Sequence, residues 1–152
     1  MAGNLGLWID HGKAFLVEFN GKGEVRRKLV SEVEPHHRFH GGAHSAKGFG
    51  SLEAASESRA ERRRANQLKT WYKEVLEAVS DSDPSRILII GPGEAKTEFM
   101  HEVEKVGQLA KKVVGMESVD HLTENQIAAM VRKYFDPEAS NGVPPYRRPP
   151  GA

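Results

Sequence analysis

The sequence contains no cysteine, and this absence excludes several kinds of chemistry. Disulfides, cysteine-ligated zinc, iron–sulfur centres and thiol nucleophiles all need that residue, so we expect a protein of the cytoplasm. Long apolar runs are missing too, because no stretch approaches the roughly 18 residues that a membrane-spanning helix requires. The first five residues lack the basic and apolar segments of a signal peptide. We therefore predict no membrane partner.

A large excess of charge of one sign is also absent from the chain as a whole. Its 22 Lys and Arg residues against 21 Asp and Glu residues give a net charge of +1. The distribution is uneven, because residues 35–76 carry 8 basic and 4 acidic side chains, whereas residues 77–140 carry 7 basic and 12 acidic ones. One part of the chain therefore has a basic field of the kind that attracts polyanions.

The order of apolar segments predicts the fold. Three strands joined by short glycine-containing turns come first and must run antiparallel, at 5–9, 14–19 and 24–33. Helices then alternate with strands, at 52–80, 86–90, 94–109, 112–116 and 123–134. Helical crossovers make the last two strands parallel to the first. We therefore predict an α/β protein with a ribonuclease H-like three-layer fold, formed by one domain at 1–136, whose five-stranded mixed sheet has the order 3-2-1-4-5.

A loop and a basic helix stand out from this pattern. Residues 34–51 are rich in glycine and histidine and have neither helical nor strand periodicity, so we expect a flexible loop. The helix that follows has an apolar stripe only in its C-terminal half, from Leu68 to Val79. That half should dock on the sheet, while the arginine-rich half projects into solvent. Residues 137–152 are rich in proline and arginine, which predicts a disordered tail.

The loop and the projecting half-helix supply the candidate site. Basic side chains there would contact the phosphates of RNA: Lys47, Arg59, Arg62, Arg63 and Arg64. The tip of the loop would consist of Gly41, Gly42, Ala43 and His44. Simpler interpretations stand beside this one, because an arginine run is commonly a solvated helix face and a glycine-rich loop is often only mobile.

Several of these features together resemble a known family. They are the order of elements, the His37-x-x-His40-Gly41-Gly42 loop followed by Ser45-Ala46, the arginine-rich helix, and the strand–turn–helix at 89–99 with its Gly-Pro-Gly turn. This combination resembles the central domain of archaeal and eukaryotic class 1 release factors and of the related Pelota proteins. The chain is similar to a stand-alone bacterial relative of that domain, a translational-machinery-like protein.

The resemblance implies a function in translation. Release factors carry Gly-Gly-Gln at the loop tip, where it enters the peptidyl-transferase centre and positions water to hydrolyse peptidyl-tRNA. By position, Gly41 and Gly42 match the glycines, but Ala43 stands in place of the glutamine, or His44 does if the match is anchored on Ser45-Ala46. The resemblance therefore implies a ribosome- or RNA-associated factor that does not hydrolyse its ligand, with the ribosome, rRNA or tRNA as partner.

Other functions remain open from the sequence. An enzyme could use His44 as a peptidyl-tRNA hydrolase, or Asp10 with Glu18 and Asp120 as a metal-dependent nuclease. A third alternative is a protein-interaction module without a nucleic-acid partner. The histidines at 36, 37, 40 and 44 could bind a transition metal, but the diglycine opposes a helix there and no carboxylate lies within the run. We predict no cofactor and no resident metal.

Overall fold

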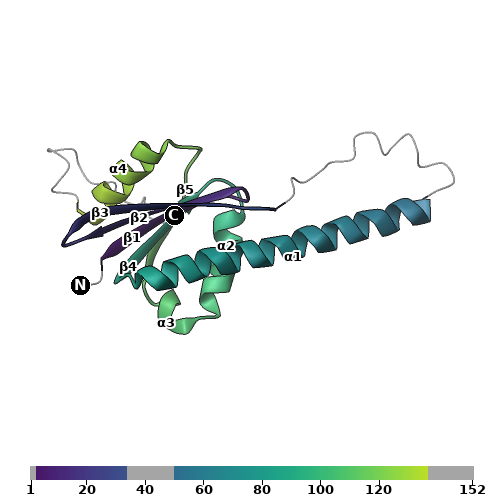
Figure 1. Cartoon of the computed structure of the whole chain (residues 1–152), viewed down its shortest axis with the longest axis horizontal. Helices are drawn as coiled ribbons and strands as arrows, with labels where there is room; N and C mark the ends of the chain where they lie inside the picture. The colour runs from purple at the N-terminus through teal and green to yellow at the C-terminus, as the bar shows by residue number, and fades with distance from the viewer. Residues whose placement is uncertain (1–2, 34–49, 137–152) are drawn as a thin grey trace, which may run out of the picture.

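The computed structural model describes residues 3–33 and 50–136 (Figure 1). Along the chain its elements are β1 (Asn4–Ile9), β2 (Lys13–Asn20), β3 (Gly23–Val30), α1 (Gly50–Ser82), β4 (Arg86–Gly91), α2 (Ala95–Glu104), α3 (Gly107–Ala110), β5 (Val113–Ser118) and α4 (Glu124–Phe135). The predicted loop and tail, including the four tip residues, Lys47 and the histidine run, lie outside the described residues except for Gly50 and Ser51, which begin α1.

The strands form one five-stranded sheet with the order β3-β2-β1-β4-β5, which confirms the predicted topology. Strands β1, β2 and β3 form an antiparallel meander, while β4 and β5 run parallel to β1. In the middle of the sheet, Leu7 of β1 pairs with Leu16 of β2 on one side and Ile89 of β4 on the other. The parallel pairs follow from the helical crossovers, because only a long connection returns a chain to the starting end of a sheet.

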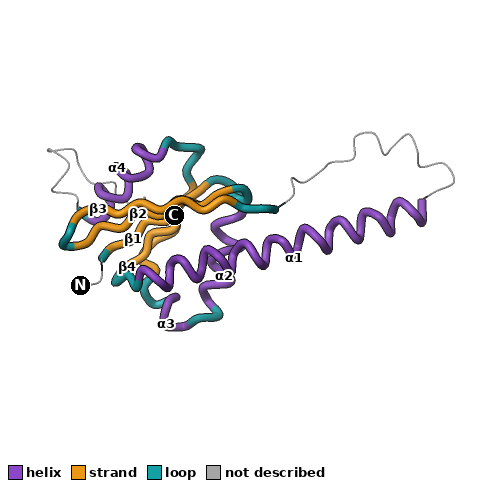
Figure 2. Tube along the Cα trace, in the orientation of Figure 1, coloured by secondary structure: helices purple, strands orange, loops and turns teal. Residues whose placement is uncertain are grey.

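Helices cover both faces of the sheet and make a three-layer α/β structure (Figure 2). Helices α1, α2 and α3 pack on the face to which alternate β1 residues Leu5, Leu7 and Ile9 contribute. Helix α4 packs on the opposite face, against a cluster that includes Trp8 and Phe15. Since successive side chains of a strand point to opposite faces, a strand covered on both sides has to be apolar throughout. The continuous apolar runs of β1 and β4 meet this requirement.

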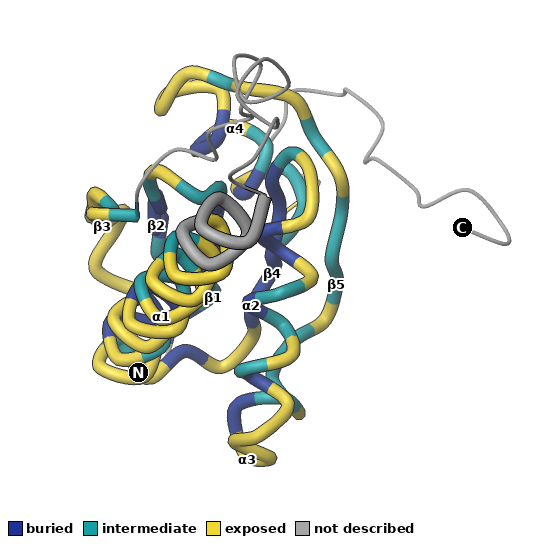
Figure 3. Tube along the Cα trace, turned by 90° about the vertical axis from the view of Figure 1, so that its right-hand side faces the viewer, coloured by how far each residue is buried: buried dark blue, intermediate teal, exposed yellow. Residues whose placement is uncertain are grey.

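Helix α1 divides into a docked half and a projecting half. It has 33 residues, which corresponds to about 50 Å at 1.5 Å per residue. Within residues 57–82 of this helix, the buried ones all lie between Trp71 and Val79, whereas residues 57–59 and 61–63 are exposed. The helix extends well beyond the sheet in Figure 1, and Figure 3 shows it from the projecting end with mostly exposed turns. The predicted division is confirmed, although the helix begins and ends two residues outside the expected 52–80.

The prediction of one continuous helix at 94–109 is wrong. The structure has two helices there, because α2 ends at Glu104 and Val106 leaves the helical region with φ −112° and ψ 87°. In a continuous helix Val106 would share the apolar side of Phe99 and Val103, but it is 41% exposed, while Leu109 of α3 is buried against the α1 face of the sheet. The break before Gly107 redirects the chain so that Leu109 reaches the core, and burial of that side chain outweighs helix continuity.

Two strands differ from their predicted bounds, because β3 ends at Val30 and not at 33, and β5 ends at Ser118 and not at 116. The capping box of α4 is formed, with the Gln126 amide donating to Thr123 Oγ1 at 3.1 Å and the Thr123 amide donating to Gln126 Oε1 at 2.9 Å. Trp8, Trp71 and Tyr72 are buried core residues. Within residues 3–33 and 50–136, no helix combines the length and the apolar composition needed to cross a membrane.

Candidate nucleic-acid interface on helix α1

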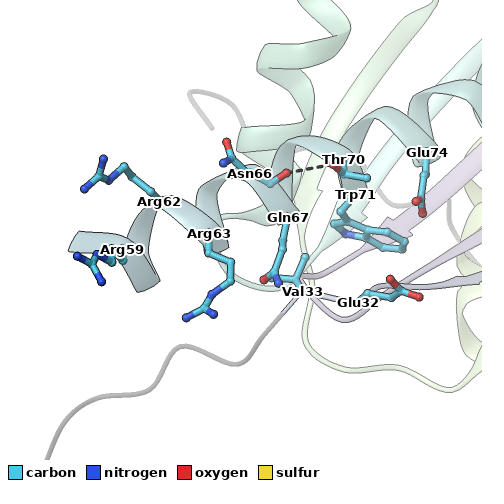
Figure 4. Close-up of a pocket in the computed structure, with 10 residues that line it drawn as sticks. All are labelled: Glu32, Val33, Arg59, Arg62, Arg63, Asn66, Gln67, Thr70, Trp71 and Glu74. Carbon is cyan, nitrogen blue, oxygen red and sulfur yellow. Dashed lines mark hydrogen bonds between the residues drawn. The ribbon is translucent and has the colours of Figure 1, made fainter. Parts of the chain in front are cut away.

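A groove runs along α1 where the helix leaves the sheet (Figure 4). It is open to solvent, has a volume of about 580 Å³, and is bounded on its other side by Glu32 and Val33, which lie in the segment after β3. The α1 residues that line it recur at helical spacing and therefore share one side of the helix: Arg59, Arg62, Arg63, Asn66, Gln67, Thr70, Trp71 and Glu74.

The outer end of the groove is basic. Arg59, Arg62 and Arg63 lie together there, and all three are exposed. The Arg62 Nε–H donates to the Ser58 carbonyl oxygen at 3.3 Å, which leaves the positive charge of the guanidinium facing outward. On the helix, the positions three and four residues from these arginines hold only Ala, Ser, Asn, Gln or Arg. The local sequence therefore concentrates positive charge at this end.

The middle of the groove is polar, with a buried aromatic residue beneath it. Thr70 Oγ1 donates to the Asn66 carbonyl oxygen at 3.1 Å, so this hydroxyl is occupied by its own helix. The Trp71 ring is only 2% exposed, and its Nε1–H donates to the Asp10 carbonyl oxygen at 3.1 Å. This hydrogen bond ties α1 to the turn between β1 and β2, at the level where the helix begins to project.

Arg64 does not share the groove with the other predicted arginines. It lies four residues before Leu68 and eight before Tyr72, so it continues the buried stripe of α1 by one turn. The side chain is half-buried, and its Nη2 lies 3.5 Å from His11 Nδ1. Its buried Nε has no hydrogen-bond partner among the described residues. The structure therefore brings together Arg59, Arg62 and Arg63 and places Arg64 against the body of the protein.

A hydrogen-bonded cluster that the sequence did not indicate lies beside Arg64. His11 Nε2 lies 2.8 Å from Glu98 Oε1, and the Tyr72 hydroxyl donates to the same oxygen at 2.5 Å. Burial on its own raises the pKa of Glu98, but the hydrogen bonds from Tyr72 and His11 outweigh it and the pKa is lowered, so the carboxylate stays ionised. Burial, reinforced by the hydrogen bond to Glu98, raises the pKa of Tyr72 and keeps the phenol protonated.

These contacts connect segments that are far apart in the sequence. His11 and Glu98 are separated by 87 positions, and no motif links them. They come together because the parallel strands β1 and β4 end at the same edge of the sheet, with His11 just after β1 and Glu98 in α2 just after β4. Through Tyr72, the cluster connects α1 to α2 and to the β1–β2 turn at the point where α1 leaves the sheet.

Asp10, a candidate nuclease residue, is engaged in a turn. Its Oδ1 accepts hydrogen bonds from the backbone amides of Gly12 and Lys13, both at 2.7 Å. Among the described residues, no group of three or more His, Asp or Glu side chains is arranged to hold a metal ion. The carboxylate of Asp10 therefore has a local structural role in shaping the β1–β2 turn.

Comparisons with known proteins gave structural matches only, since neither a family model nor a curated protein matches the sequence. Solved structures of Pelota proteins and of an archaeal release factor are among the neighbours. Pelota from Archaeoglobus fulgidus is 14% identical with a TM-score of 0.49, covering 90% of this chain and 36% of that chain. Pelota from Thermoplasma acidophilum is 14% identical with a TM-score of 0.48, covering 87% and 32%.

The archaeal translation termination factor aRF1 is 12% identical with a TM-score of 0.43, covering 84% of this chain and 37% of that chain. The chain thus spans about a third of the length of each of these proteins. Both kinds of protein named by the sequence resemblance occur among the neighbours. At these identities and TM-scores the likeness by itself says nothing of what this chain does.

Proposed function

We propose that this protein binds RNA through the arginine end of the α1 groove and acts as a ribosome-associated factor of the translation machinery. The single observation that carries the proposal is the exposed cluster of Arg59, Arg62 and Arg63 on the projecting half of α1. A guanidinium group binds phosphate oxygens through two parallel hydrogen bonds, and contacts of this kind supply most of the sequence-independent affinity for nucleic acids.

The position of the cluster supports binding to a large partner. The arginines lie on a helix that extends beyond the sheet, so a bulky polyanion can approach them without meeting the body of the protein. The sequence resemblance suggests that this polyanion is rRNA or tRNA on the ribosome. In that proposal, Lys47 adds a further phosphate contact, and Gly41, Gly42, Ala43 and His44 form the tip that probes the ribosome. A ribosome-bound protein of this kind would work in the cytoplasm.

The proposed factor does not hydrolyse peptidyl-tRNA. The support is chemical, because Ala43 has no side-chain group that could orient water where release factors carry glutamine. Incubation of the purified protein with peptidyl-tRNA and ribosomes should therefore give no free peptide. Peptide release that disappears in His44→Ala would contradict this part of the proposal and favour the hydrolase alternative.

The RNA-binding proposal is tested with a charge-neutralised groove. Fluorescence anisotropy with a labelled single-stranded rRNA fragment would compare the wild type with an Arg59→Gln/Arg62→Gln/Arg63→Gln variant across a range of salt concentrations. Each lost phosphate contact removes about 0.7 from the slope of log K against log salt for single strands, so three contacts remove about 2. The same relation makes the loss of affinity about 100-fold at 0.1 M salt.

A matched control separates the groove from overall charge. The variant Lys22→Gln/Lys105→Gln/Lys111→Gln also removes three positive charges, but from exposed positions outside the groove. It should keep the wild-type salt slope, and it should still sediment with ribosomes at low salt, whereas the arginine variant should not. Equal losses in the two variants, or wild-type protein that stays free of ribosomes at low salt, would overturn the proposal.

A further inference from the structure

The groove on α1 changes the sign of its charge along its length. Figure 4 shows Arg59, Arg62 and Arg63 at one end and the carboxylates of Glu32 and Glu74 at the other, beside Trp71. The two glutamates come from different elements, one from the segment after β3 and one from α1, and both are exposed. Among the described residues neither of them is in an ion pair. The inner end of the groove is therefore acidic, and we call the pair Glu32 and Glu74 the acidic mouth. Two separate parts of the fold form it.

We infer that Glu32 and Glu74 set where the bound RNA strand ends in the groove. A strand held by the arginines crosses α1 at its outer end and turns away, and it does not follow the groove toward the sheet. The recognised ligand is then a short run of phosphates. This inference rests on the proposed function, because it specifies the length and path of the RNA at the same site.

The spacing along the helix explains how one groove can attract and repel phosphates. Glu74 lies eleven residues beyond Arg63, which is about 16 Å along the helix axis. That distance exceeds the screening length of about 8–10 Å at physiological salt, so the carboxylate hardly weakens contacts at the arginines. A phosphate at the level of Thr70 would lie four residues, or about 6 Å along the axis, from Glu74 and within the range of its repulsion.

The apolar walls of the inner end add to the free-energy cost of placing a phosphate there. Val33 and the edge of the buried Trp71 ring border the groove there, so a phosphate that entered would exchange water for apolar surface. Removal of a charged group from water without a compensating cation is unfavourable. The three arginines that could supply such a cation lie at the opposite end. Continued binding along the groove is therefore disfavoured by both charge and desolvation.

The test measures how affinity depends on the length of the RNA. Labelled oligouridines of about 4 to 20 nucleotides would be titrated against the wild type and a Glu32→Gln/Glu74→Gln variant at 0.05 M salt. For the wild type, affinity should stop rising at a short length. The variant should match the wild type on the shortest oligomers and bind the longer ones at least about 3-fold more tightly, because like-charge repulsion at the inner end is removed.

Two further variants make the result decisive. Glu61→Gln/Glu104→Gln removes two exposed carboxylates outside the groove, one of them next to Arg62, and any effect it has should be the same for every length. Glu32→Lys/Glu74→Lys should extend the binding site and add up to about 1.4 to the salt slope on long oligomers. Thermal unfolding would establish that each variant is folded.

The outcomes separate this inference from the function beneath it. If neither substitution at Glu32 and Glu74 alters the length at which affinity stops rising, the inference is overturned, while a loss of binding in the arginine variant still supports RNA binding. A gain that is equal at all lengths also overturns it, because that result reports only net charge. If the wild type binds no oligouridine, both the inference and the proposed function are wrong.

Discussion

Gly6 of β1 provides a quantitative test of the three-layer packing. A Cβ atom at this position would lie 2.2 Å and 2.5 Å from the two methyl groups of Val131 and 2.9 Å from its Cβ, whereas ordinary contacts lie at 3.4–4 Å. Valine in a helix has one strongly preferred χ1 rotamer, and this residue of α4 is 0% exposed, so its two methyl groups cannot turn away without strain or new clashes in the packed core. In Gly6→Ala, helix α4 therefore has to lift away from the sheet by more than 1 Å.

The size of the effect follows from this geometry. Overpacking of a core costs about 1–3 kcal/mol, and we expect the upper end because the clash is with the base of a side chain on a helix. Alanine regains about 0.5–1 kcal/mol over glycine within a strand, which leaves a net loss of about 2 kcal/mol. Val131→Ala alone should also cost about 2 kcal/mol, since it removes two buried methyl groups and leaves a cavity.

The double variant decides whether the two losses have one cause. Because Val131→Ala removes the two closest clashes and leaves only the 2.9 Å contact, Gly6→Ala/Val131→Ala should lose about 2 kcal/mol and not the additive 4 kcal/mol. Urea denaturation would measure these free energies, with an unchanged m-value showing that unfolding stays two-state. A Gly6→Ala variant as stable as the wild type, or strict additivity in the cycle, would refute the reasoning.

Two further substitutions probe the attachment of α1 to the sheet. Tyr72→Phe removes a hydrogen bond that lowers the pKa of Glu98, so that pKa should rise toward its ordinary value of 4.5. Since a carboxyl group with a lowered folded-state pKa stabilises the protein above its unfolded pKa, the wild type should be the more stable at pH 7. This advantage should shrink as the pH falls below about 4.5 and through the lowered pKa, which urea titrations from pH 7 to pH 3 would measure; an advantage independent of pH would contradict it. Trp71→Phe removes the donor to the Asp10 carbonyl oxygen together with buried ring area, and should cost about 1–3 kcal/mol in the same assay, while an unchanged midpoint would show that this contact contributes nothing.

The strands and their order could be predicted because the signals for them are local. Leu5–Ile9 and Ile87–Ile90 are continuous apolar runs, which is typical of strands covered on both faces, and the glycine-containing turns between the early segments allow only an antiparallel meander. The Thr123 and Gln126 pair is a local signal as well, since a capping box depends only on residues three positions apart.

The interruption between α2 and α3 was not predictable in the same way. The residues at 94–109 have helical spacing throughout, and Gly107 alone does not end a helix. The break occurs because Leu109 is buried against the same face of the sheet as α1, at 6% exposure. Burial of Leu109 against residues distant in the sequence therefore outweighed the local preference for a continuous helix.

The arginine run shows where sequence and tertiary structure divide. Composition and helical spacing by themselves determined that a basic half-helix leaves a mixed sheet, because hydrophobic periodicity and charge are properties of neighbouring residues. Helical spacing already places Arg64 on the stripe of Leu68 and Tyr72, but only the folded chain shows that Arg62 and Arg63 line a groove while Arg64 lies against His11. The acidic mouth at Glu32 and Glu74 and the contact of His11 with Glu98 also required tertiary structure. Each of them joins segments that meet only when the sheet forms, and the linear order of residues carries no record of such distances.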